Sequence, residues 1–164
     1  MGSERRSTVE GLNGTTRAEL RHVLNCVKAA TGYDGYINHL IIRRLDSSAF
    51  TSDAFLAWVR TQPQDAQDLG LSVLEAQWEL SNTPNYTGSL EAVVRLIERH
   101  LPEAHWRVEK SCEYPALSGR THQFTGYCGG YSTPERAEGS TPALALLAAF
   151  LEAIALTLPQ SDIP

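Results

Sequence analysis

Apolar residues recur at helical spacing from about residue 19 onward. The segment ELRHVLNCVKAA places its apolar residues on one side of a helix: Leu20, Val23, Leu24 and Val27. This spacing predicts an amphipathic helix. Thr16 and Glu19 have the spacing of a capping box, so the helix should begin at Thr16. Gly32 is its expected end, because glycine tolerates a left-handed backbone.

Three further helical segments are predicted before residue 84. Asp34 is placed to cap a helix that continues to Leu45, and Thr51 or Ser52 to cap a short one after it. The stretch LSVLEAQWEL, residues 71–80, fits a helix better than a strand, although its shortness leaves a strand open. The segment TQPQDAQDLG before it is expected to be a polar connector.

The stretch SNTPNYTG, residues 81–88, breaks the pattern, and a compact unit is expected from 85 to 158. Its first helix carries an apolar side and should end at Pro102. From His105 the period changes to two, which predicts a strand through Tyr114. The segment PALSGR predicts a turn, and THQFTGYC, residues 121–128, predicts the returning antiparallel strand. The glycine-containing segment GGYSTPERAEGS, residues 129–140, is interpreted as a mobile loop.

The last helix should begin with Thr141 as its cap and Pro142 at its first position. It is apolar nearly all round, which indicates a helix that is buried on several sides or lies in a subunit interface. We therefore expect a homo-oligomer that forms through residues 142–158.

These elements predict an α/β (α+β) fold with a small antiparallel sheet packed between helices and a helical N-terminal part. Residues 1–15 are expected to form a mobile tail. Residues 16–84 form the helical part, and residues 85–158 form the α-β-β-α unit.

Composition narrows the functional classes. Hydrophobic residues make up 42% of the 164, which is typical of a globular domain. The net charge of -5 argues against a general nucleic-acid binder. The three cysteines form no CxxC pair, which favours a reducing interior over a disulfide framework. The polar first residues do not resemble a signal peptide, and no apolar run is long enough to cross a bilayer. A cytoplasmic protein is expected.

The candidates for catalysis or metal binding are weak. Cys112, His122 and Cys128 could converge from the two strands, but small packed cysteines and a solvated histidine explain them more simply. Cys128 and His122 lie six residues apart, roughly 20 Å along a straight strand, so they cannot form a nucleophile–base pair. Cys112 with His122 remains as an alternative. We expect no catalytic residues, no metal and no cofactor.

Aromatic and basic residues gather around the two strands and their loops, a combination that suits a planar, phosphorylated ligand through stacking and charge-assisted bonds. The candidate ligand-binding residues are Arg107, Tyr114, Arg120, His122, Tyr127, Tyr131 and Arg136. Packing at the surface or at an interface explains the same residues. The segment GSTP before the last helix also presents backbone amides near Arg136, although an ordinary helix cap accounts for them.

Several of these segments together resemble the phage ABA-sandwich domain family. The resemblance is carried by YTGSLEAVVRLIERHLPEAHWRV, by the closing STPALALLAAFLEAI, and by ELRHVLNCVKAATGYDGYINHLIIRRL near the start. It implies a layered α/β/α fold and a phage origin, and it implies no catalytic residues. The chain departs from the family pattern by an inserted segment near residues 46–84.

The resemblance and the absence of a catalytic constellation predict a non-enzymatic phage or prophage accessory protein that acts by binding in the cytoplasm of a bacterial host. A more specific form of this hypothesis is that the protein sequesters a nucleotide-type signal of bacterial immunity. A structural, assembly or protein-interaction module is the alternative. A hydrolase that depends on Cys112 or a metal is the third hypothesis.

Overall fold

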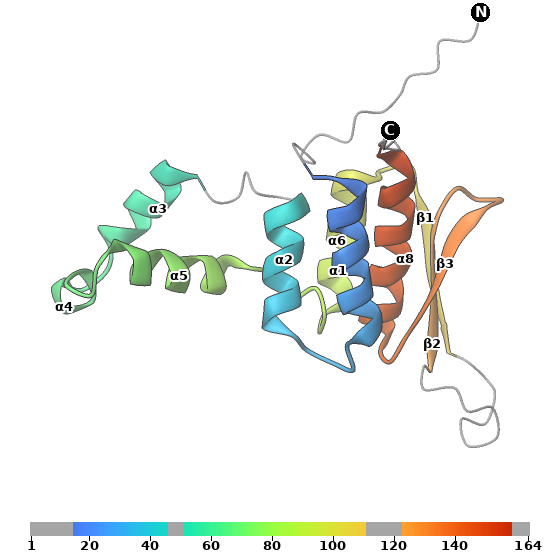
Figure 1. Ribbon diagram of the computed structural model, residues 1–164, viewed down its shortest axis with the longest axis horizontal. Helices are drawn as coiled ribbons and strands as arrows, with labels where there is room; N and C mark the ends of the chain where they lie inside the picture. The colour runs from blue at the N-terminus through green and yellow to red at the C-terminus, as the bar shows by residue number, and fades with distance from the viewer. Residues whose placement is uncertain (1–14, 46–50, 111–122, 159–164) are drawn as a thin grey trace, which may run out of the picture.

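The computed structural model describes residues 15–45, 51–110 and 123–158, which form seven helices and one three-stranded antiparallel sheet (Figure 1). The helices are α1 (Arg17–Ala29), α2 (Gly35–Leu45), α3 (Ser52–Val59), α4 (Gln64–Gln67), α5 (Leu71–Asn82), α6 (Leu90–His100) and α8 (Pro142–Thr157). The strands are β1 (His105–Lys110), β2 (Phe124–Gly129) and β3 (Pro134–Gly139). The predicted α+β class, with helices in the N-terminal part and a small antiparallel sheet, is confirmed.

Side-chain caps fix the starts of several helices. At α1, the Thr16 hydroxyl accepts a hydrogen bond from the Glu19 amide, and the Glu19 carboxylate accepts one from the Thr16 amide, so the predicted capping box is present. Asp34 accepts bonds from the amides of Tyr36 and Ile37 at the start of α2. The end of α1 differs from the prediction: the helix ends at Ala29, and Ala30 caps it with an extended backbone.

Two of the motifs that carry the family resemblance contact each other. The Thr87 amide donates to the Asn38 side chain over 2.8 Å, and the Asp34 amide donates to the Thr87 hydroxyl over 2.8 Å. Thr87 and Asn38 are both buried. The turn before α2 and the turn before α6 are thus joined by polar bonds, which brings the segments on either side of residues 46–84 together.

The sheet has the strand order β1-β2-β3. Arg107 pairs with Tyr127, and Tyr127 pairs with Arg136. The prediction of a loop over residues 129–140 is wrong for residues 134–139, which form the edge strand β3. Its inward side chain Ala137 is small and its outward residues are charged, so the strand lacks the β-branched and aromatic residues that usually mark one.

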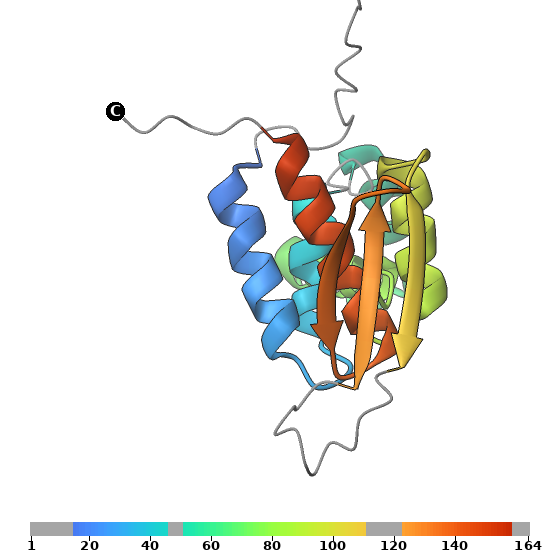
Figure 2. The same ribbon diagram turned by 90° about the vertical axis from the view of Figure 1, so that its right-hand side faces the viewer.

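Helix α8 forms the centre of the molecule. One side packs against β2 and β3, and the others face α1 and α6 (Figures 1 and 2). Its residues from Ala143 to Leu151 are all buried. The apolar surface that predicted either burial on several sides or a subunit interface is therefore covered within the chain, apart from Leu156 near its end, which is 60% exposed.

Two glycines allow this close packing. A Cβ atom on Gly126 would lie 2.3 Å from the Ala145 carbonyl oxygen, and one on Gly139 would lie 2.5 Å from the Ala145 amide nitrogen.

The described helices all lie on the α8 side of the sheet, so they do not enclose it from both sides as expected (Figure 2). The opposite face, which we call the open face, carries no described helix.

Helices α3, α4 and α5 form an arm, residues 51–82, that projects away from the sheet (Figure 1). Phe55 of α3 packs on Trp78 of α5, with ring centroids 5.4 Å apart. Within the described residues, the main core cluster draws on α1, α2, α6, α8 and the sheet, and none of its members comes from the arm. The arm is therefore an appendage to a core that is built from segments on both sides of it in the chain.

Candidate functional site

The open face of the sheet brings together three of the predicted ligand-binding residues. Paired residues of neighbouring antiparallel strands share a face. Because Arg107, Tyr127 and Arg136 are paired in register, they form one row across all three strands. We call them the Arg–Tyr–Arg row. They lie on the face opposite Gly126 and Gly139, which meet α8.

The row contains a direct cation–π contact. The guanidinium carbon of Arg107 lies 4.1 Å from the centroid of the Tyr127 ring, within the range for attraction to an aromatic face. Arg107 and Arg136 are exposed, whereas Tyr127 on the central strand is half-buried. The row thus presents an aromatic ring between two accessible guanidinium groups.

A row of carboxylates lies directly beside it. Glu109 and Glu138 flank Thr125 in the next register position. Arg107 Nε lies 3.1 Å from a Glu109 oxygen, and Arg136 Nη2 lies 3.4 Å from a Glu138 oxygen. Both pairs are solvent-exposed, and exposed pairs of this kind contribute about 0–1 kcal/mol. An anion can therefore replace the carboxylates at small cost.

The remaining predicted residues are less central. Tyr131 in the β2–β3 turn is 86% exposed, and the ring centroid of His105 lies 5.2 Å from its own in an edge-on contact. Tyr114, Arg120 and His122 lie outside the described residues, as does Cys112. The structure thus places Arg107, Tyr127 and Arg136 together, with Tyr131 at the neighbouring end of the sheet.

Arg136 also borders a hollow at the edge of β3. With Lys28, Ala137 and Glu138 it lines a volume of about 390 Å³. Lys28 is paired with Glu152 over 2.8 Å. The helix start considered as an anion site is used by its own cap, because the Thr141 hydroxyl accepts the Leu144 amide. The hollow is lined by two basic side chains, Lys28 and Arg136, together with Ala137 and the carboxylate of Glu138.

The two cysteines in the described residues have different surroundings. Cys128 is fully buried on the α8 side of the sheet, and this burial raises the pKa of its thiol to about 11. Cys26 lies 3.8 Å from a nitrogen of His22 on the same helix. No group of three or more metal-ligating side chains occurs in the ranges that the structure covers.

A groove at the end of α6 was not found from the sequence. Its volume is about 590 Å³, and it lies between the segment after α6, the β2–β3 turn and the last turns of α8. His100, which lines it, is 6% exposed, and neither of its ring nitrogens has a hydrogen-bond partner among the described residues. Burial, assisted by the nearby charge of Arg99, lowers the pKa of His100. A signal existed: His100 continues the buried stripe of Val93, Leu96 and Ile97 at helical spacing.

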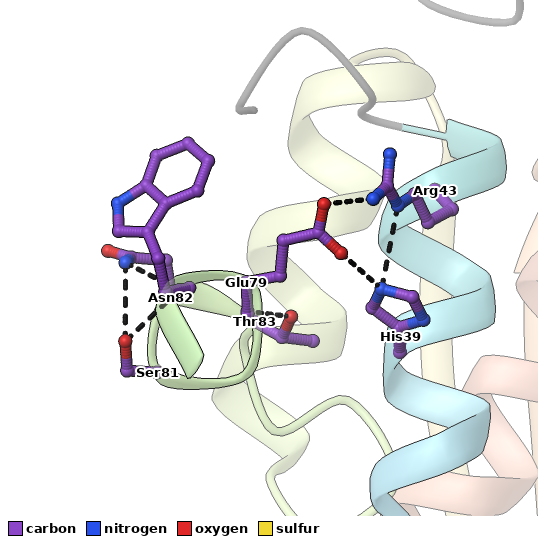
Figure 3. A network of polar contacts seen from close by, with 7 residues as sticks. His39, Arg43, Glu79, Ser81, Asn82 and Thr83 are labelled. Atoms are coloured by element: carbon purple, nitrogen blue, oxygen red, sulfur yellow. Dashed lines mark hydrogen bonds and ion pairs between the residues drawn. The ribbon is translucent and has the colours of Figure 1, made fainter. Parts of the chain in front are cut away.

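A polar joint, defined as Glu79, His39 and Arg43, connects the arm to the body (Figure 3). His39 Nε2 lies 2.8 Å from one oxygen of Glu79, and Arg43 donates to the other. Burial raises the pKa of Glu79, but the hydrogen bonds with His39 and Arg43 outweigh it and hold that pKa below its usual value. The joint therefore holds an ionised carboxylate between α2 and α5.

Comparisons with protein-family models, curated proteins and solved structures found no match. The resemblance to the phage ABA-sandwich family accordingly stays a prediction. Of the helices in the described ranges, none has both the length and the hydrophobicity needed to cross a membrane.

Proposed function

We propose that the protein is a non-enzymatic phage or prophage accessory protein that acts by binding in the cytoplasm of a bacterial host. The phage origin and the compartment rest on the sequence resemblance. The binding activity rests on one observation, the Arg–Tyr–Arg row on the open face, which carries none of the described helices. A nucleotide-type immune signal is the ligand class that we assign to it.

The chemistry of the row supports this ligand class. A planar base stacks on an aromatic ring, and a phosphate accepts charge-assisted bonds from guanidinium groups. Tyr127 supplies the ring, and Arg107 and Arg136 lie on either side of it in the register. The hollow beside Arg136 and Lys28 offers room of about 390 Å³ next to the row, within the usual range for small-molecule sites.

The neighbouring carboxylates determine whether removal of a charge strengthens or weakens the binding of an anion. Glu109 and Glu138 neutralise the two arginines in the free protein, so an anionic ligand must displace them. Removal of the carboxylate charges should strengthen binding of an anion, whereas removal of the guanidinium groups should abolish it. Opposite effects from the two rows would show that the ligand is recognised as an anion, and a control at a distant arginine distinguishes a specific site from a general effect of charge.

Calorimetry against cyclic dinucleotides and ADP-ribose tests the proposal. We expect micromolar binding by the native chain, a loss of at least tenfold in Arg107→Met and Arg136→Met, and a gain in the double variant Glu109→Gln, Glu138→Gln. Arg95→Met is the matched control, because Arg95 is an exposed arginine paired with Glu91 on α6. Absence of micromolar binding across the panel would reject the nucleotide assignment.

The arm favours a second candidate, a protein-interaction or assembly module. Val73, Ala76 and Leu80 recur at i, i+3 and i+7 on α5 and are exposed, with Leu80 at 64%. They lie on the opposite side of the helix from the buried Leu74 and Trp78. An exposed apolar stripe of this kind is typical of a helix that packs on a partner.

The charge of the arm indicates the kind of partner. The arm holds five acidic residues and one basic residue, so two arms would repel each other. A basic amphipathic helix of another protein provides the complementary charge. This surface replaces helix 142–158 as the place for association, because most of that helix is covered within the chain.

A designed helical peptide of leucine and lysine probes the arm, with a leucine–glutamate peptide of the same pattern as its control. We expect only the basic peptide to bind, and we expect Val73→Asp with Leu80→Asp to remove that binding. Equal binding of both peptides would refute the charge argument. Dimerisation of the native chain in light scattering, lost in the same double variant, would instead assign the stripe to self-association.

A further inference from the structure

The groove at the end of α6 has the features of a second binding site, separate from the open face. Its walls come from the segment after α6, the β2–β3 turn and the end of α8, and they are largely apolar. The apolar surface is supplied by Leu101, Pro102, Ala104, Ala153 and Leu156. Leu156, the one exposed large apolar residue of α8, lies at its border. A volume of about 590 Å³ is enough for a small organic molecule.

His100 gives the groove an unused polar group. Its ring packs against Phe150, with centroids 6.3 Å apart. Both ring nitrogens are buried, and no described residue bonds to either. Buried polar atoms are nearly always hydrogen-bonded, because leaving one unpaired is unfavourable. His100 lines the groove and its imidazole has no partner among the described residues, so a ligand that enters the groove and reaches this ring would supply the missing hydrogen bond.

The charges of the lining define the chemical class of that partner. A neutral imidazole offers one N–H donor and one acceptor nitrogen, and burial favours the neutral form here. The lining also carries Arg99 and two carboxylates, Glu103 and Glu135. This balance does not favour an anion, in contrast to the exposed guanidinium groups of the open face.

We propose that this groove binds a small uncharged molecule with an apolar body and one hydroxyl or amide group, and that this group hydrogen-bonds to the imidazole of His100. The apolar body covers Leu156 and the residues of the segment after α6. This site is independent of the Arg–Tyr–Arg row and of the arm.

Three naphthalene compounds test the proposal by fluorescence titration at neutral pH: 2-naphthol, 2-methylnaphthalene and 2-naphthoate. The native chain should bind 2-naphthol about five- to tenfold more tightly than 2-methylnaphthalene, the ratio expected for one hydrogen bond. It should bind the carboxylate least. The variant His100→Phe keeps an aromatic ring against Phe150 and should remove the preference for the hydroxyl.

Two further variants complete the experiment. Leu156→Ser changes an exposed residue, so the variant should fold normally. It should weaken the binding of 2-naphthol and of 2-methylnaphthalene to the same extent. Arg107→Met should leave the affinity for both compounds unchanged, which would show that this site is separate from the open face. The proposal is overturned if the native chain shows no saturable binding of 2-naphthol. It is also overturned if His100→Phe, with native circular dichroism, keeps the preference for the hydroxyl.

Discussion

Gly126 and Gly139 determine how closely α8 approaches the sheet. At both positions an added Cβ would lie well inside van der Waals distance of the α8 backbone around Ala145. The obstacle is main chain, which cannot rotate away as a flexible side chain can. The absence of a side chain at these two positions therefore allows the helix to lie flat on β2 and β3.

Gly126→Ala should destabilise the protein by about 1–3 kcal/mol, the usual effect of overpacking a well-filled core. Urea unfolding followed by circular dichroism measures the change. Gly32→Ala is the control, because nothing lies within 4 Å of its added Cβ and its φ is not positive. Equal midpoints for Gly126→Ala and the native chain would show that α8 is not held this close to the sheet.

His100 should make stability depend on pH below neutrality. Its pKa in the folded chain is lowered, first by burial and then by Arg99, so the unfolded chain takes up a proton first. Stability is therefore lost as the pH falls through the unfolded value of about 6.5 toward the lower folded pKa. In His100→Phe this part of the loss should disappear.

Urea unfolding at pH 8 and pH 5.5, for the native chain and His100→Phe, measures this effect. The stability difference between the two proteins should shift in favour of the variant at the lower pH. The Glu79 joint titrates equally in both proteins, so the comparison cancels its contribution. A difference that is constant across pH would contradict a buried neutral imidazole.

Single residues were most predictable where a side chain acts on its own backbone. The caps at Thr16, Asp34, Thr51 and Thr141 are bonds across two or three residues, so the local sequence contains both partners. The burial of His100 could be read from its place on an apolar stripe. Its lack of a partner depends on segments far away in the chain, which local spacing does not contain.

At the scale of elements, the polar joint is the feature that fixes the arm. Glu79 brings a buried carboxylate to His39 and Arg43 of α2. Glu79→Gln keeps the size of the side chain but removes its charge, so charge-assisted bonds become neutral ones. We expect the arm to lose about 1–3 kcal/mol of its local stability.

Amide hydrogen exchange measures this local effect. In Glu79→Gln, exchange should accelerate in α3 and α5 and stay unchanged in α6 and α8. Glu75→Gln is the matched control, because Glu75 is an exposed glutamate on the same helix. Uniform acceleration across the whole chain would show that the arm and the body unfold as one unit.

Elements with a clear hydrophobic periodicity could be predicted from the sequence, and those without one could not. A helix was favoured over residues 71–80 because Leu71, Leu74 and Trp78 fit helical spacing, and α5 extends it to Asn82. Strand β3 was missed because it has almost no apolar signal: Arg136 and Glu138 face outward, and its inward positions hold Glu135, the small Ala137 and Gly139, which lies against the backbone of α8. An edge strand of this type is defined by its neighbour and not by its own composition.

For the whole molecule, the sequence indicated that α8 is either buried on several sides or part of a subunit interface, but it did not indicate which segments cover it. Its partners α1, β2 and β3 come from both ends of the chain, and such pairing is not encoded in local spacing. The same limit applies to the site. Arg107, Tyr127 and Arg136 could be assigned to one neighbourhood from the sequence, but their alignment in one row depends on β3 and on the register of the strands.

We propose that the protein binds a nucleotide-type ligand on the open face of the sheet. Amide chemical shifts recorded during a titration with ADP-ribose and a cyclic dinucleotide test this proposal most directly. We expect saturable shifts centred on Arg107, Tyr127 and Arg136, with α5 and the His100 groove unaffected. Shifts confined to the arm or the groove, or none at millimolar ligand, would contradict it.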